Sequence, residues 1–175
     1  GHVPEMIDAG IDSFKIEGRM KTALYVATVA RTYRKAIDDY MKDPKLYEAN
    51  MEWYKEEIGK CTYREFTTGF YFGKPGSDAQ IYNSNTYVKN YTYLGTVEEA
   101  DGKGRCRIEQ KNKFSVGETI EIMKPDGRNL DVVVKSICDE DGNGQESAPH
   151  PKQILWVDLG ADVDKYDILR KKEDN

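Results

Sequence analysis

Residues 13–22, SFKIEGRMKT, carry the strongest indication of fold in this chain. Phe14 and Ile16 alternate with charged residues, which is the period of a half-buried β-strand. A glycine-containing turn and a long helical pattern follow directly. In α/β proteins, ligands bind beyond the carboxyl ends of the strands, so the turn with Glu17 and Arg19 is a candidate site.

The predicted strand has too little sequence before it to build a sheet. Residues 4–9 predict a short helix, with Pro4 in its first turn and Gly10 as its stop. The order helix, strand, helix is typical of the closing edge of a larger α/β domain. Residues 1–60 are therefore expected to be the last strand and helices of a domain whose earlier strands are missing.

Three segments resemble peptidase family U32, the collagenase-like peptidases, and they occur in the same order. They are residues 4–21, 66–73 and 147–151. The first resembles the last βα unit of the family's catalytic TIM-like barrel. The family's signature cysteines and most of its barrel precede that unit. The resemblance thus implies that this chain is a carboxy-terminal region without the catalytic domain.

The resemblance implies two alternative activities for the parent enzyme. The family name implies a peptidase, whereas some relatives hydroxylate a tRNA wobble uridine or a ribosomal RNA cytidine. Some relatives also carry an iron–sulfur cluster on barrel cysteines, which implies such a cluster in the missing catalytic domain. The matching turn makes Glu17 and Arg19 substrate-binding candidates, since an Arg fork clamps carboxylates or phosphates. The alternative is a local ion pair that closes the barrel.

Two amphipathic helices are expected after the turn. Thr22 is a typical N-cap, and an apolar stripe of helical spacing runs to Tyr40. Pro44 interrupts the pattern, and a second helix is predicted over residues 45–58 with Gly59 as its stop. Helices cut from their partner surface expose apolar side chains, so we expect a homodimer to form through them.

Residues 61–90 are predicted to be a connector rich in aromatic residues. Aromatic side chains outnumber aliphatic ones here and are set among glycines and Pro75. One interpretation is an ordered link between two domains, pinned by its aromatic side chains. The other is a stacking platform or active-site lid for bases or peptides.

The chain from Tyr91 onwards is predicted to be β-structure. Short alternating segments separated by glycine-rich turns indicate six strands over residues 91–175, which is typical of a closed antiparallel barrel. The segment 112–122 resembles the second domain of elongation factor Tu. We therefore predict a mainly β fold preceded by helices, with a barrel of that type at its carboxy-terminal end.

Lysine and arginine residues in this barrel suggest a local basic face. The predicted face comprises Arg105, Arg107, Lys111 and Lys113, with Lys103 and Lys124 as further members. Such a face would bind RNA phosphates. The alternative is an ordinary solvated surface, because the chain as a whole has a net charge of −5.

Composition and motifs favour a cytoplasmic protein without a site of its own. The three cysteines are widely spaced, as in reduced thiols, and no metal site is predicted. No apolar run is long enough to span a membrane. His150 lies between two prolines without a spaced catalytic partner, so no catalytic residue is assigned in this chain.

The function predicted from these observations is a non-catalytic accessory domain. It would position peptide or tRNA substrate, or dock on the catalytic barrel of a U32 peptidase. The alternative is a tRNA-binding module of a U32-type tRNA hydroxylation enzyme. Whether the parent is a hydrolase, as the family name implies, is left open at this point.

Overall fold

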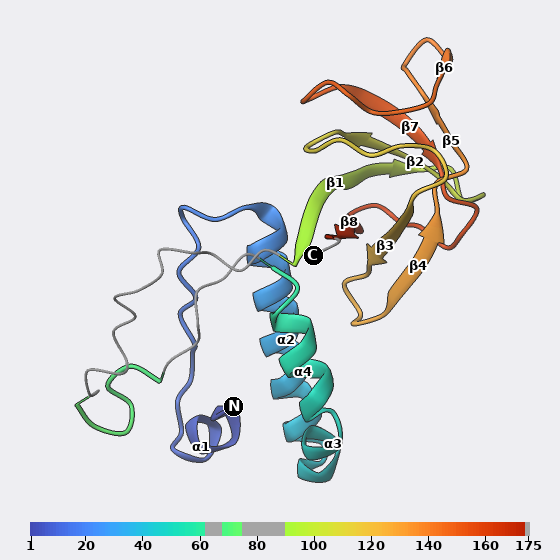
Figure 1. The fold of residues 1–175 in the computed structure, drawn as a ribbon. Coiled ribbons are helices and arrows are strands. Elements are labelled where there is room, and N and C mark those ends of the chain that lie inside the picture. The colour runs from blue at the N-terminus through green and yellow to red at the C-terminus, as the bar shows by residue number, and fades with distance from the viewer. Residues whose placement is uncertain (62–67, 75–89, 174–175) are drawn as a thin grey trace.

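The computed structural model describes residues 1–61, 68–74 and 90–173. Its described part consists of a helical region followed by a curved β-sheet (Figure 1). Most of the predicted connector, residues 61–90, lies outside the described residues. The helices are α1 Val3–Asp8, α2 Ala23–Lys42, α3 Pro44–Ala49 and α4 Met51–Ile58.

The helix boundaries follow from capping side chains. The Thr22 hydroxyl accepts a hydrogen bond from the Tyr25 N–H at 3.3 Å, which confirms the predicted start of α2. The Asp43 carboxylate caps α3 in the same way. The single helix predicted over residues 45–58 is wrong, because the chain breaks at Asn50 and continues as α4.

The strand predicted around Phe14 is absent. Residues 11–18 run as an irregular segment beside the helices, with no strand partner in the described structure. A strand needs a neighbour to satisfy its backbone hydrogen bonds. The alternating pattern at Phe14 and Ile16 therefore does not by itself produce a strand among the described residues.

All strand pairs in the sheet are antiparallel. The strands are β1 Tyr91–Ala100, β2 Arg105–Glu109, β3 Thr119–Met123, β4 Asn129–Val133, β5 Ser136–Cys138, β6 Gly144–Gln145, β7 Ile154–Asp158 and β8 Ile168–Lys172. They form one eight-stranded sheet in the order β4-β3-β8-β1-β2-β7-β5-β6. The predicted number of six strands is wrong. Residues 130–137 divide into β4 and β5, and the short strand β6 was not predicted.

The sheet bends into a half-barrel around a hydrophobic core. The register of β1 shifts between Tyr93 and Gly95 and again between Val97 and Glu99, so this long strand pairs with β8 at one end and with β2 at the other. The concave face buries aliphatic side chains from both halves, including Leu94, Ile108 and Leu169.

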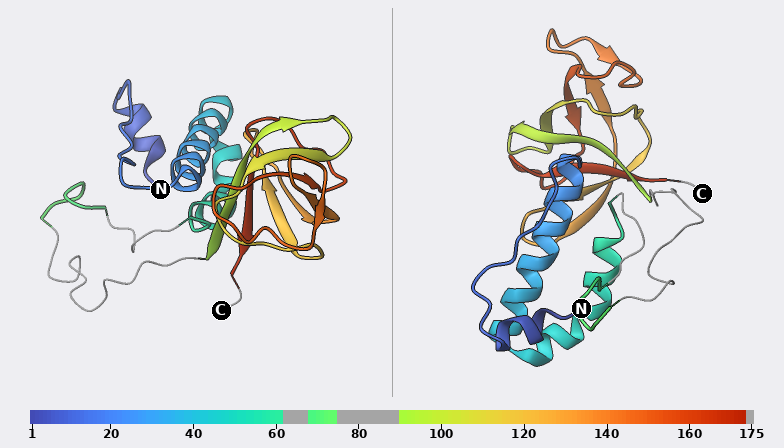
Figure 2. Two further views of the ribbon diagram at one scale, coloured as in Figure 1. Left: turned by 90° about the horizontal axis from the view of Figure 1, so that it is seen from above. Right: turned by 90° about the vertical axis from the view of Figure 1, so that its left-hand side faces the viewer.

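The helices pack against the β8 and β3 side of this half-barrel (Figure 2). Leu24 of α2 forms a small buried cluster with Met123 of β3 and Ile168 of β8. The buried Thr28 hydroxyl contacts the Met123 sulfur at 3.6 Å. Apart from this apolar patch, the interface is built from charged side chains. Among the described residues, no helix has both the length and the apolar character needed to cross a membrane.

Candidate functional site

The turn with the predicted site residues is exposed. The Glu17 carboxylate accepts a hydrogen bond from the Arg19 backbone N–H at 2.8 Å, and the two side chains form no ion pair in the described structure. A Cβ atom at Gly18 would lie 2.9 Å from Val26 Cγ2. The glycine therefore allows the turn to lie close against the start of α2, and this contact orients Glu17 and Arg19.

The predicted basic face does not form one continuous patch. Arg105 and Arg107 project from the outer face of β2, where the Arg105 guanidinium lies 5.6 Å from the Trp156 ring centroid. Arg107 forms ion pairs with Glu98 and, at 3.1 Å, with Glu140. Arg107 is thus paired with carboxylates, whereas Arg105 is exposed and packs against an aromatic ring.

The predicted lysines separate into three places. Lys111 and Lys113 are exposed beyond the end of β2, and Lys103 is exposed in the turn at its opposite end. Lys124 is buried at 2% exposure, with its Nζ 2.9 Å from carboxylate oxygens of Asp164 and Asp167. It therefore contributes nothing to a binding surface.

A buried charge cluster joins the helices to the sheet. At its centre lies Glu57 of α4, whose Oε1 accepts a hydrogen bond from Arg170 Nη2 of β8 at 2.7 Å and another from Arg31 of α2. The Asn129 side chain of β4 donates to Glu57 Oε2 at 2.8 Å. The side chains of Glu57 and Arg170 are 1% and 0% exposed. Four helical and sheet elements, α2, α4, β4 and β8, thus meet at one carboxylate.

A second carboxylate, Glu121 of β3, extends this cluster. Arg170 Nε donates to Glu121 Oε1 at 2.5 Å, and Lys60 Nζ lies 3.1 Å from Glu121 Oε2. The Arg170 guanidinium also lies 5.1 Å from the Tyr91 ring centroid. We refer to Arg31, Glu57, Lys60, Glu121 and Arg170 as the interface charge cluster.

Electrostatics keep Glu57 and Lys60 of the interface charge cluster ionised. Burial alone raises the pKa of Glu57, but the Arg170 and Arg31 guanidinium groups outweigh it and lower the pKa below its ordinary value. For Lys60, burial lowers the pKa, whereas Glu121 and Glu57 raise it to a net upward shift. Opposite charges thus offset the cost of desolvation, which is the condition for a stable buried ion pair.

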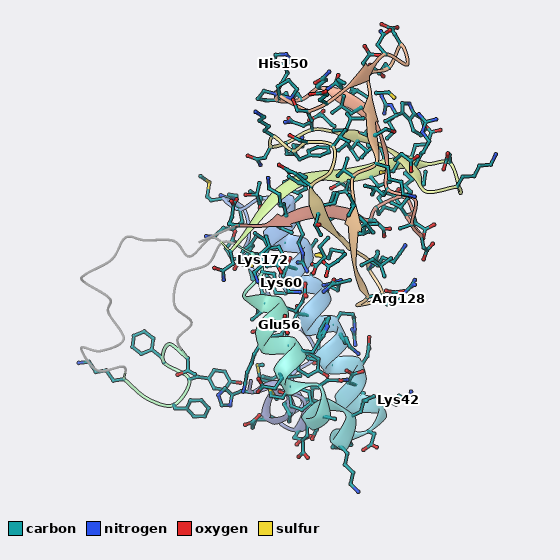
Figure 3. The ribbon with its side chains drawn as sticks, turned by 45° about the vertical axis from the view of Figure 1, so that its right-hand side comes forward. Lys42, Glu56, Lys60, Arg128, His150 and Lys172 are labelled. Carbon is teal, nitrogen blue, oxygen red and sulfur yellow. The ribbon has the colours of Figure 1, made fainter. Side chains whose placement is uncertain are left out.

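A polar groove of about 570 Å³ opens beside this cluster. Figure 3 labels three residues of its lining, Glu56, Lys60 and Lys172, at the junction of helices and sheet. Tyr91 and Asp131 also line the groove. Acidic and basic side chains alternate around it, so its lining favours neither anions nor cations.

The cysteines do not fit an iron–sulfur cluster. Cys61 lies after α4, Cys106 is in the sheet core, and Cys138 is half-buried on β5, so the three do not converge. Burial raises the pKa of Cys61 to about 11 and that of Cys106 to about 12, which keeps both thiols protonated. No group of three metal-ligating side chains lies within residues 1–61, 68–74 and 90–173.

Arg31 is a residue of the interface charge cluster that the sequence analysis did not single out. It is 7% exposed, on the same face of α2 as Leu24 and Thr28. The spacing of seven residues from Leu24 was a usable signal, because residues at i and i+7 share a helix face. A buried charge on such a face requires a partner, and Glu57 is that partner.

Two sequence models of one protein family match this chain. The model of peptidase family U32 matches residues 1–81, and that of the peptidase family U32 C-terminal domain matches residues 89–170. The chain is similar to tRNA hydroxylation protein P1 of Bacillus subtilis, with 38% identity over 97% of this chain and 40% of the relative.

Two further similarities concern proteins with peptidase names. A collagenase of Porphyromonas gingivalis is 31% identical over 70% of this chain and 34% of its own length. The crystal structure of the C-terminal domain of a U32 protein from Geobacillus thermoleovorans is 31% identical, with a TM-score of 0.43. That match covers 47% of this chain and 92% of the solved one. The chain spans only about 40% of the length of tRNA hydroxylation protein P1 of Bacillus subtilis.

Proposed function

This chain belongs to peptidase family U32, and on that basis we propose that its half-barrel is an accessory domain that positions tRNA for hydroxylation by the family's catalytic domain. In this proposal the chain is non-catalytic by itself, and residues 1–60 belong to the catalytic TIM-like barrel. Residues 61–90 connect them to the β domain of residues 91–175. The parent enzyme acts in the cytoplasm, where its tRNA is found.

The interface charge cluster is the observation that carries this proposal. Glu57 and Arg31 belong to helices in the part of the chain matched by the U32 model, whereas Glu121 and Arg170 belong to the β domain. The Arg170–Glu57 and Lys60–Glu121 ion pairs and the hydrogen bond from Asn129 to Glu57 join the two parts, whereas the Arg31–Glu57 and Arg170–Glu121 pairs each lie within one part. A domain held in this way extends the substrate-binding surface of its neighbour, since positioning requires a fixed geometry.

Similarity favours tRNA over peptide as the substrate. The relative with tRNA hydroxylation in its name matches 97% of this chain at 38% identity, against 70% at 31% identity for the collagenase. We retain the peptidase as the second candidate because of the collagenase similarity.

The finer features of the proposal concern the fold. The β domain would share the barrel type of the second domain of elongation factor Tu, a fold that contacts RNA or a neighbouring domain. The turn with Glu17 and Arg19 would lie at the mouth of the catalytic barrel. An iron–sulfur cluster, if the parent enzyme uses one, would be held by residues outside this chain.

Deletion of the gene that encodes this chain tests the proposed function. We expect hydroxylated nucleosides, measured by mass spectrometry of digested total tRNA, to disappear and to return when the wild-type gene is restored. A restored gene with Glu57→Ala should return them only in part, because the β domain is no longer fixed.

Unchanged hydroxylation together with lost gelatin cleavage would contradict the proposal and favour the peptidase. Peptide hydrolysis by the purified chain, in proportion to its concentration, would contradict its non-catalytic role.

A further inference from the structure

Two loops at one end of the β domain are joined by backbone hydrogen bonds. The loop after β2 and the loop before β7 pair where the Lys152 N–H donates to the Gln110 carbonyl at 2.8 Å and the Gln110 N–H donates to the Gln153 carbonyl at 2.8 Å. The Ala148 N–H donates to the Phe114 carbonyl at the same distance. These bonds fix residues 110–114 against residues 148–153.

Buried side chains anchor both loops beneath this pairing. Phe114 and Ala148 are fully buried in the core of the half-barrel. The Gln110 side chain is 1% exposed, and its Nε2 donates to the Ala148 carbonyl at 2.8 Å. The loops are therefore held as firmly as the strands that they connect. The backbone positions from which their outer side chains project are fixed, which reduces the backbone part of the entropic cost of binding.

This end of the domain carries an excess of positive charge. We define the lysine rim as Lys111, Lys113, His150 and Lys152, all of which are exposed. Lys111 is paired with Glu109, whereas Lys113 and Lys152 form no ion pair with any described residue. Glu109, Glu118 and Glu146 are the acidic residues on or beside these loops, and Glu118 is paired with Lys171 of β8. The rim is thus basic although the chain has a net charge of −5.

The position of the lysine rim suits a substrate that also reaches the catalytic domain. In Figure 1 the loops after β2 and before β7 point to the side of the molecule on which residues 11–21 run. In Figure 3 His150 lies at the far end of the sheet from Glu56 and Lys60. The rim is therefore free of the helix–sheet interface, and its side chains are open to a large ligand.

We propose that the lysine rim binds the phosphate backbone of tRNA. This proposal rests on the proposed function and adds to it the surface and the chemical group that are contacted. Lysine binds phosphate as a point charge without base specificity. The rim would therefore position tRNA without reading its sequence, and recognition of the reacting base would be left to the catalytic domain.

Titration of tRNA with the purified chain at several salt concentrations tests the lysine rim. The test variant is Lys111→Gln/Lys113→Gln/Lys152→Gln. The matched control is Lys103→Gln/Lys135→Gln/Lys165→Gln, which removes the same charge from exposed lysines in other loops. We expect the rim variant to bind at least about tenfold more weakly, with the slope of log K against log salt reduced by about two to three. The control should keep the wild-type slope.

Equal binding by the rim variant and the control, or no salt-dependent binding by the wild-type chain, would overturn the rim proposal. Thermal unfolding of each variant checks that the fold is intact. The proposed function is judged separately, from nucleoside analysis after gene deletion. If hydroxylation is lost on deletion but the rim variant binds normally, the function stands and the rim fails. If binding depends on the rim but hydroxylation survives deletion, the rim stands and the function fails.

Discussion

At the scale of single residues, Glu57 has the largest expected effect on stability. Replacement by Gln leaves the buried guanidinium groups of Arg31 and Arg170 without their shared carboxylate. We expect the free energy of unfolding, measured in urea, to fall by about 3–5 kcal/mol. Glu52→Gln is the control, because Glu52 is 89% exposed and pairs only with Lys55. A loss of less than about 1 kcal/mol for Glu57→Gln would contradict the assigned role.

The same carboxylate predicts how stability depends on pH. Since the pKa of Glu57 is lowered in the folded chain, its contribution is fully present above the ordinary value of 4.5 and is lost as the pH falls through the folded value. The unfolding free energy of the wild type should therefore fall more steeply below about pH 4.5 than that of Glu57→Gln. Parallel curves for the two proteins would show that Glu57 is not ionised against the arginines.

Thiol accessibility gives a third test at this scale. Cys61 and Cys106 are 1% and 0% exposed, and burial raises the pKa of both thiols well above neutral pH. Iodoacetamide at pH 8 should therefore modify Cys138 first in the folded chain, and mass spectrometry should find a single adduct. All three cysteines should react in guanidinium chloride. Equal reaction rates at Cys106 and Cys138 in the folded chain would be inconsistent with this core.

At the scale of elements, the turn between β1 and β2 depends on one close backbone approach. A Cβ atom at Gly104 would lie 2.7 Å from Gly160 Cα, and the φ angle of Gly104 is +98°. Gly104→Ala should therefore destabilise the chain by about 2–4 kcal/mol in thermal unfolding, since neither backbone can move aside. Gly102→Ala is the control, because it has a φ of +71° but open space around it, and it should cost about 1 kcal/mol. Equal losses for both would contradict the packing argument.

Local patterns predicted most of these elements but not their partners. The caps at Thr22 and Gly59 and the alternation in β2 and β7 depend on near neighbours in sequence, so the sequence indicates them directly. The division of residues 130–137 depends on where the sheet bends, and strand formation by residues 13–17 depends on a pairing partner, which the described residues do not provide. Contacts between distant segments decide both features.

Dependence on distant contacts also decides which parts of the candidate site could be predicted from the sequence. The positions of Glu17 and Arg19 on an exposed turn follow from the local sequence. In the interface charge cluster the bond from Arg170 to Glu57 joins residues 113 positions apart, and no local pattern reveals that pairing. The residues of the predicted basic face are divided because Arg105 and Arg107 project from β2, Lys111 and Lys113 lie beyond its end, and Lys124 is buried.

At the scale of the whole molecule, the interface charge cluster should make the helices and the half-barrel unfold together. The chain has two tryptophans, and one lies in each part: Trp53 on α4 and Trp156 on β7. Trp156→Phe leaves fluorescence that reports on the helices, and Trp53→Phe leaves fluorescence that reports on the half-barrel. We expect both proteins to show the same urea midpoint after correction for the small effect of each substitution, because coincident transitions are the mark of one cooperative unit.

Glu57→Gln, introduced into both single-tryptophan proteins, tests whether the interface charge cluster is the reason that the two parts unfold at the same urea concentration. The half-barrel has its own hydrophobic core, whereas the helices have only a small apolar contact with it through Leu24. With the charge cluster broken, the Trp53 signal should therefore change at lower urea than the Trp156 signal. If the two midpoints stay together after Glu57→Gln, apolar packing alone couples the two parts. The fixed orientation that substrate positioning requires would then have to come from Leu24, Met123 and Ile168 instead of the buried charges.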